Sequence, residues 1–139
     1  TQDHSDRVLP AFCFNAVRNR DLRVDGCNHL FDFTHITDTA RGLALVVEQL
    51  EHNERNLPPT HLLPGIGTTL GEAAELATRA AGSRSRILEA PSRRYDVSRF
   101  IGDPTQAKKL FAWQASVTPE QGIKLLVEAF QKQLQDVPA

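Results

Sequence analysis

The chain has 139 residues, of which 40% are hydrophobic and 24% charged, and its 16 basic and 17 acidic side chains give a formal net charge of -1. This balance excludes nucleic-acid binding or anionic-membrane binding through overall charge, and the composition is that of an ordinary globular protein. We expect one domain over residues 1–139, and no apolar run is long enough to cross a bilayer.

The chain is expected to begin with a helix followed by two short strands. Apolar residues at helical spacing predict the helix over residues 8–17. A brief strand over 22–24 is closed by Asp25-Gly26, which is a turn signal. Residues 31–36 alternate aromatic and β-branched side chains, which predicts the second strand.

A strong helix is predicted next, over residues 39–50, with Thr37 or Asp38 as its N-cap. It carries one apolar stripe, formed by Ala40, Leu43, Val46, Val47 and Leu50. The polar stretch that follows, residues 51–59, ends in two prolines and is predicted to be a loop.

The middle of the chain is predicted to form a strand, a turn and a helix. Residues 61–63 are expected to be a buried strand, and Gly65-Ile66-Gly67 is expected to turn the chain. The helix over 70–81 has a capping box and a terminal glycine, supplied by Thr68 or Thr69 with Glu72 and by Gly82.

The last third of the chain adds a strand over 85–89, a short helix that Asp103 or Thr105 starts and Phe111 ends, and a helix over 119–134. Strands therefore alternate with about five helices, which predicts an α/β fold.

Common catalytic patterns are missing from the sequence. G-x-G-x-x-G, G-x-x-x-x-G-K-[ST] and G-x-S-x-G do not occur, and Tyr95 is followed four residues later by Arg99, so no Tyr-x-x-x-Lys pair can form. The histidines show no metal-ligand spacing, so we expect no metal site, and we expect Cys13 and Cys27 to be reduced and structural. The first residues do not resemble a signal peptide, so a cytoplasmic location is expected.

Four stretches in a fixed order resemble one enzyme family. They are DRVLPAF (6–12), LRVDG with FDFTHITDTARGLALVVEQL (22–26 and 31–50), HLLPGIGTTLGEAAELATRAAG (61–82) and RRYDVSRFIGDPTQAKKLFAWQASVTPEQGIKLLVEAF (93–130). Together they resemble the C-terminal part of extended short-chain dehydrogenases/reductases, the NAD-dependent nucleotide-sugar epimerases, dehydratases and decarboxylases. The resemblance covers nearly the whole chain and implies the C-terminal lobe of a Rossmann-type fold.

The resemblance also implies what this chain does not carry. In that family the N-terminal half holds the glycine-rich NAD fingerprint and the Ser/Thr, Tyr and Lys of catalysis. We therefore expect a substrate-binding lobe with no catalytic residue and no cofactor of its own, NAD belonging to the complete enzyme. The alternative is a stand-alone binding or assembly module without catalysis. The implied partners are a nucleotide sugar and either the missing Rossmann half or a second copy of the chain.

By resemblance, Arg93 stands where the family's arginine grips the diphosphate of the nucleotide sugar, a task that suits a planar guanidinium. A surface arginine paired with Asp96 is the other interpretation, and the two stay equally open. Tyr95 replaces the family's glycine in this turn. Asp103, Lys108 and Trp113 are expected to serve capping and packing.

Other substrate-binding candidates follow from the same resemblance. Arg7 corresponds to an arginine at the start of the first helix, with a solvated helix-start residue as the alternative. The segment Arg23, Val24 and Asp25 corresponds to the strand edge that lines the base pocket. Phe31 replaces a second phosphate-binding arginine, and Ala112 replaces a glycine before the tryptophan.

Overall fold

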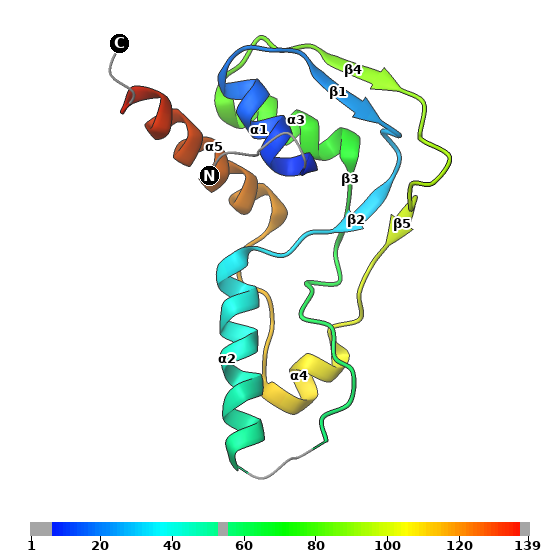
Figure 1. Cartoon of the computed structure of the whole chain (residues 1–139), viewed down its shortest axis with the longest axis vertical. Helices are drawn as coiled ribbons and strands as arrows, with labels where there is room; N and C mark the ends of the chain where they lie inside the picture. Colours follow the sequence, from blue (N-terminus) through cyan, green and yellow to red (C-terminus); the bar gives the residue numbers. More distant parts are fainter. Residues whose placement is uncertain (1–6, 53–55, 137–139) are drawn as a thin grey trace. The chain divides into compact units, whose positions relative to one another are not determined.

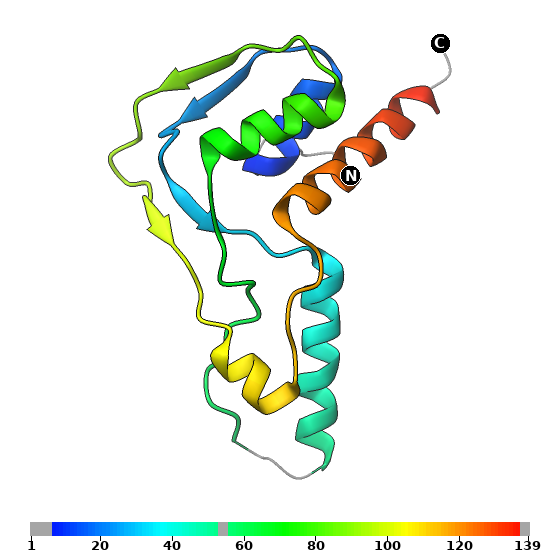
Figure 2. The same ribbon diagram turned by 180° about the vertical axis from the view of Figure 1, so that it is seen from behind.

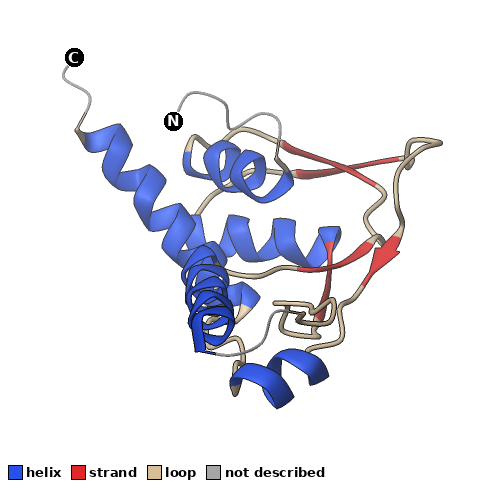
Figure 3. Cartoon of the chain, turned by 60° about the horizontal axis from the view of Figure 1, so that its bottom comes forward, coloured by secondary structure: helices blue, strands red, loops and turns tan. Residues whose placement is uncertain are grey.

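The computed structural model describes residues 7–52 and 56–136, within which there are five helices and five short strands (Figures 1 and 3). The α/β class and the number of helices are as predicted. The chain divides into two compact units. The first unit comprises residues 1–29, 69–98 and 120–139, and the second comprises 30–68 and 99–119. The single-domain expectation stays a prediction, and each unit is described by itself.

The first unit places two helices against a pair of parallel strands. Its elements are α1 (Val8–Val17), β1 (Leu22–Asp25), α3 (Leu70–Ala81), β4 (Ile87–Ala90) and α5 (Pro119–Gln135). Strands β1 and β4 run parallel, with Leu22 opposite Ile87 and Asp25 opposite Ala90. Helix α3 packs against α1 and against both strands (Figure 2).

Small side chains bring the helices of the first unit together. Ala73, Ala74 and Ala77 of α3 are fully buried, which lets α1 approach closely. Cys13 of α1 is also fully buried, and burial raises the pKa of its thiol to about 12. A thiol with so high a pKa is not a nucleophile at neutral pH. Both cysteines are free, as expected.

The second unit is a three-stranded sheet with two helices. Its elements are β2 (Leu30–Asp32), α2 (Ile36–His52), β3 (Gly67–Thr69), β5 (Arg99–Phe100) and α4 (Thr105–Phe111). The strand order is β3-β2-β5, and β2 and β5 are parallel. Helices α2 and α4 lie side by side (Figures 1 and 2).

Trp113, which follows α4, is the centre of the second unit's core. Trp113 and Ala107 are fully buried and Phe111 is 9% exposed. Partly buried apolar side chains surround this cluster, namely Leu45, Val46, Leu57, Leu62, Leu110 and Ala115. The packing depends on Gly42 of α2, because a Cβ there would lie 2.8 Å from Leu62 and 2.9 Å from the indole nitrogen of Trp113. The packing role expected for Trp113 is confirmed.

The helix at 70–81 shows the predicted local signals in full. The Thr69 hydroxyl accepts from the Glu72 N–H at 3.1 Å, and the Glu72 carboxylate accepts from the Thr69 N–H at 2.8 Å. Gly82 ends the helix with a φ of 60°. The capping box therefore uses Thr69 of the two threonines considered. The α1 prediction is confirmed at both ends.

Three predictions in the second unit are wrong: the strand at 61–63, the extent of the strand at 31–36, and the N-cap of the helix that follows it. Residues 61–63 form no strand. The strand of this region is β3 at Gly67–Thr69, which begins at the last residue of the turn predicted over Gly65-Ile66-Gly67. Gly67 fits there because a Cβ would lie 2.9 Å from both Leu30 and Ile101. Segment 61–63 is held by side-chain bonds instead: Thr34 Oγ1 donates to the Leu62 carbonyl at 3.3 Å.

The expected strand over 31–36 is also wrong in its extent. Strand β2 ends at Asp32, and α2 begins at Ile36, so Thr37 and Asp38 lie inside the helix and are not its N-cap. The Asp38 carboxylate instead accepts hydrogen bonds from Ser116 and Val117, so its oxygens are not used to cap the helix. No helix within residues 7–52 and 56–136 combines the length and the apolar character that crossing a membrane requires.

Candidate functional site

The candidate site lies in the first unit, where the parallel strands β1 and β4 end together. Asp25 is the last residue of β1 and Ala90 the last of β4, and the Gly26 N–H donates to the Ala90 carbonyl at 3.0 Å. The loop after β4 carries Arg93. Ligands of open α/β sheets bind outside the carboxyl ends of parallel strands, so this edge is where the fold favours a ligand.

Arg93 is held by a tight turn. Its Nε–H donates to Asp96 Oδ2 at 3.0 Å, and its backbone N–H donates to the same oxygen at 3.3 Å. The hydrogen bond and the charge of Asp96 raise the pKa of Arg93, and the same contacts lower the pKa of Asp96. The guanidinium carbon also lies 5.4 Å from the centre of the Tyr95 ring. The Asp96 pairing considered from the sequence is therefore present.

The pairing with Asp96 leaves most hydrogen-bond donors of the Arg93 guanidinium unused. Within the described residues, the hydrogen bonds of the Arg93 side chain use only the Nε–H of its five donors, and 59% of the side chain is exposed. Asp96, by contrast, is 15% exposed. A largely buried carboxylate thus fixes one edge of an exposed guanidinium, and the four remaining N–H donors can meet a ligand.

Arg23 and Asp25 form a second pair on the neighbouring strand end. The Arg23 Nε–H donates to Asp25 Oδ1 at 2.9 Å, and Asp25 lies close enough to Arg93 to raise the pKa of that guanidinium. Val24, between them, points into the core and is fully buried, so only its backbone faces this edge. The structure therefore brings Arg23, Asp25 and Arg93 into one neighbourhood.

Arg7 is not part of this cluster of hydrogen bonds. It holds the N-cap position of α1 in extended backbone, and its side chain does not cap the helix. Its carbonyl accepts from the Ala11 N–H at 2.9 Å. Within residues 7–52 and 56–136, no hydrogen bond or ion pair joins its guanidinium to Asp25 or Arg93, so its suggested role stays a prediction.

The sequence did not show that His29 lies at this site, or that a glycine is required at position 26. Gly26 has a φ of 73°, and a Cβ there would lie 2.7 Å from the His29 ring. The His29 charge contributes to the lowered pKa of Asp96, so the ring is an electrostatic neighbour of the turn. The Asp25-Gly26 turn signal marked this corner in the sequence, but nothing local indicated which side chain would fill the space left by the glycine.

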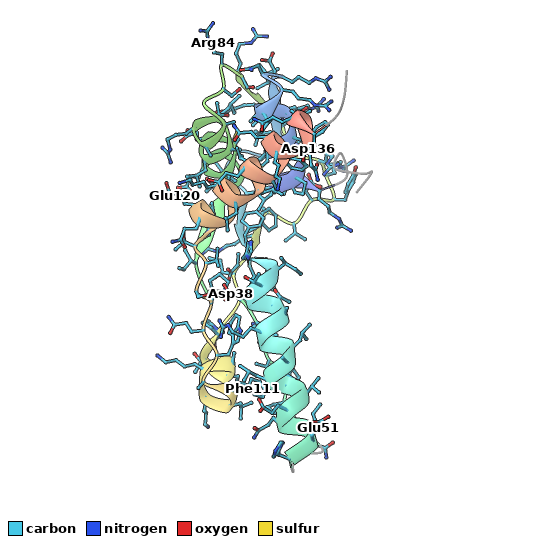
Figure 4. The ribbon with its side chains drawn as sticks, turned by 90° about the vertical axis from the view of Figure 1, so that its left-hand side faces the viewer. Asp38, Glu51, Arg84, Phe111, Glu120 and Asp136 are labelled. Atoms are coloured by element: carbon cyan, nitrogen blue, oxygen red, sulfur yellow. The ribbon has the colours of Figure 1, made fainter. Side chains whose placement is uncertain are left out.

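Two buried carboxylates in the second unit are structural. Asp38 is 1% exposed, and its oxygens accept from the Ser116 N–H, the Ser116 hydroxyl, the Val117 N–H and Arg41. Burial raises the pKa of this carboxyl, but the hydrogen bonds outweigh it and hold the pKa well below its usual range. Figure 4 shows Asp38 near the start of α2 and Phe111 on α4 beside that helix.

Asp32 has a different arrangement. Its Oδ2 accepts from the backbone N–H groups of Gly65 and Gly102, at 2.9 and 3.1 Å. Its Oδ1 is buried without a hydrogen-bond partner among the described residues. Both backbone donors belong to loops beside the sheet, so this carboxylate holds loops in place.

The described residues supply neither a metal site nor a dinucleotide cradle. No group of three or more His, Cys, Asp or Glu side chains gathers with metal-ligand geometry in residues 7–52 and 56–136. The sequence also lacks the glycine-rich fingerprint that binds a dinucleotide.

Comparison with known proteins shows which proteins the chain is similar to. No family model matches the chain. UDP-glucuronic acid decarboxylase 1 of Danio rerio is 27% identical over 132 residues, which is 93% of this chain and 30% of the decarboxylase. The UDP-glucose 4-epimerase of Thermotoga maritima, solved with UDP-glucose, is 27% identical with a TM-score of 0.84, over 96% of this chain and 42% of the epimerase.

The resemblance to the extended short-chain dehydrogenases/reductases is confirmed. The UDP-glucose 4-epimerase of Stenotrophomonas maltophila, solved with NAD and a formylated UDP-arabinopyranose, has the same fold with a TM-score of 0.84 and 17% identity, and the chain covers 42% of it. The chain thus spans less than half the length of each of these three similar proteins. The relatives that share 27% identity with the chain are a nucleotide-sugar decarboxylase and a nucleotide-sugar epimerase.

Proposed function

We propose that this chain is the substrate-binding portion of an NAD-dependent nucleotide-sugar epimerase/dehydratase, that it is not catalytically competent alone, and that Arg93 binds the diphosphate of the nucleotide sugar. The observation that carries the proposal is the Arg93–Asp96 turn at the carboxyl ends of β1 and β4. The Thermotoga maritima relative was solved with UDP-glucose, which supports the ligand class. NAD would be bound by residues outside this chain.

The proposed role of each residue follows from its contacts. Asp96 orients Arg93, because one carboxylate oxygen accepts both the backbone N–H and the Nε–H of that arginine. The terminal amino groups of Arg93 would donate to diphosphate oxygens, in the bidentate geometry that suits guanidinium. Arg23 and Asp25 would flank the nucleotide end of the ligand, with Arg23 held by its partner.

The charges at this edge determine how strongly we expect a nucleoside diphosphate to bind. The two arginines and two aspartates of the pairs, Arg23 with Asp25 and Arg93 with Asp96, sum to zero, and Arg94 adds one positive charge. Phe31, at the position of the family's second phosphate-binding arginine, packs its ring 6.3 Å from Phe33. We therefore expect binding of nucleoside diphosphate to depend on Arg93 and to be weaker than with two phosphate-binding arginines.

Calorimetric titration of the chain with UDP tests the proposal. Arg93→Ala should weaken binding about tenfold or more, since a hydrogen bond to a charged group contributes about 1.5 to 3 kcal/mol. Arg94→Ala is the matched control, because Arg94 is the exposed neighbouring arginine and lies outside the turn's bonds. Absence of heat with UDP, or equal weakening by both variants, refutes the role of Arg93. The stand-alone assembly module would give that result with an intact fold.

A further inference from the structure

Tyr95 belongs to the turn that holds Arg93, and most of its side chain lies in water. It is 79% exposed, which is the largest exposure of any large hydrophobic residue in residues 7–52 and 56–136. A single exposed hydrophobic residue needs no functional explanation. This ring, however, lies 5.4 Å from the Arg93 guanidinium carbon, in the loop that follows the carboxyl end of β4. It therefore adds a flat apolar surface beside the charged donors of the candidate site.

The turn accommodates this side chain without backbone strain. The Asp96 N–H donates to the Arg93 carbonyl at 3.1 Å, so Arg94 and Tyr95 are the two central residues of the turn. The resemblance described from the sequence places a glycine at position 95, and a glycine there would permit a positive φ. Tyr95 is not among the described non-glycine residues with a positive φ. The turn of this chain thus presents a side chain where a glycine would present none.

We infer that the Tyr95 ring stacks on the base of the nucleoside diphosphate whose phosphates Arg93 binds, an inference that rests on the proposed function. One ligand can meet both groups, because the ring and the guanidinium are neighbours. The guanidinium suits phosphate oxygens, and the ring suits the flat face of a base. Arg23 and Asp25, which we propose to flank the nucleotide end, lie at the end of the same strand pair. We therefore expect the base, and not the sugar, beside the ring.

Stacking of this kind would make the site prefer nucleotides without selecting one base. Every base has a flat face of π electrons, and for that reason stacking on an aromatic side chain tolerates a change of base. Tyr95 should therefore distinguish UDP or ADP from pyrophosphate, which has the two phosphates and no base. Arg93 should contribute to the binding of all three, since each offers phosphate oxygens.

Calorimetric titrations of the chain with UDP, ADP and pyrophosphate test the inference. We expect Tyr95→Ala to weaken binding of UDP and of ADP about fivefold or more, and to change binding of pyrophosphate by about twofold at most. Tyr95→Phe keeps the ring and should keep the affinity for UDP. Val97→Ala is the matched control, because Val97 is another apolar residue of the same loop, 61% exposed, and should change no affinity.

Nuclear magnetic resonance tests the contact directly. Tyr95 is the only tyrosine of the chain, so its ring protons can be assigned without ambiguity. With UDP bound, we expect nuclear Overhauser effects between these protons and the carbon-bound protons of the uracil ring. Their absence while UDP is bound would refute the stacking.

The remaining outcomes separate this inference from the proposed function. Equal weakening of UDP and pyrophosphate by Tyr95→Ala would overturn the stacking, because the ring would then only orient Arg93. A loss with Tyr95→Phe as large as with Tyr95→Ala would overturn it by assigning the effect to the hydroxyl group. An unchanged affinity for UDP in Tyr95→Ala, while Arg93→Ala weakens binding, would refute the stacking and leave the diphosphate role standing. No binding of UDP by the native chain would refute both.

Discussion

The buried carboxylate of Asp38 offers the sharpest test of how the second unit is held together. The two carboxylate oxygens of Asp38 accept four hydrogen bonds: three connect α2 to Ser116 and Val117 after Trp113, and the fourth comes from Arg41 of α2 itself. Asp38→Asn keeps the shape of the side chain but replaces one acceptor oxygen with an NH2 group. Each oxygen of Asp38 accepts two hydrogen bonds, and an NH2 group in its place cannot accept them. About two of the four bonds are therefore lost.

The size of the effect follows from which bonds are lost. Each hydrogen bond to a charged group contributes about 1.5 kcal/mol or more, and the Arg41 bond is discounted because that side chain is 44% exposed. We expect Asp38→Asn to lower the free energy of unfolding by about 3 kcal/mol, which corresponds to roughly 10 °C in melting temperature. Urea denaturation at pH 7 measures the free energy, with Asp136→Asn as the control, since Asp136 is an exposed residue just after α5.

The effect should also depend on pH. The folded pKa of Asp38 is lowered, so its stabilisation is present above the ordinary aspartate pKa of about 3.9 and is lost as the pH falls through the folded value. The difference between the native chain and Asp38→Asn should therefore shrink below about pH 4. Equal stability at pH 7, or a difference that stays constant down to pH 3, would refute the reasoning.

Three further substitutions test local features by urea denaturation. Ala112 ends α4 with a φ of 49°, so Ala112→Gly should stabilise by up to about 1 kcal/mol, and a loss of stability would show that the alanine is not strained. Thr69→Ala removes the acceptor for the Glu72 N–H and should cost about 1 kcal/mol, whereas Thr69→Ser should cost much less; equal losses would contradict the capping role. Gly42→Ala forces a methyl group against Trp113 and should cost about 1 to 3 kcal/mol with altered near-ultraviolet dichroism, so an unchanged spectrum would be the contrary result.

Helices were predictable from the sequence where their signals are local. The helix at 70–81 has its cap, its first-turn glutamate and its terminal glycine within the segment itself, so the sequence placed both ends. Asp38 shows the limit of this reasoning. Its side chain has the chemistry of an N-cap, but its partners Ser116 and Val117 lie 78 and 79 residues away and cannot be seen in a local pattern.

Strands were harder because short strands are defined by their partners. The sequence 61–63 has a suitable apolar pattern, yet β3 forms at Gly67–Thr69, where the neighbouring Leu30 and Ile101 leave room only for a glycine. The two-residue strand β5 was not predicted, since its pairing with Leu30 and Phe31 is its only defining feature. At the candidate site, the Arg93–Asp96 pair was accessible because its members are three residues apart.

The apolar stripe of α2 was predicted as a pattern, but its exposure was not. Periodicity placed Leu43, Val46, Val47 and Leu50 on one face, but it could not show that Val46 packs against the core of the second unit while the other three stay exposed. The position of Gly42 decides this, because its missing side chain admits Leu62 and Trp113. Packing across the chain, and not the apolar pattern itself, determines which side of α2 faces inward.

The interleaving of the two units constrains how the protein can be made. The chain runs from the first unit to the second and back twice, through segments 1–29, 30–68, 69–98, 99–119 and 120–139. During synthesis the β1 segment leaves the ribosome 65 residues before its partner β4, since Leu22 pairs with Ile87, and α5 is the last helix to emerge. Neither unit can be completed until most of the chain has emerged from the ribosome. Truncating the chain at any one position cannot produce either unit complete and by itself.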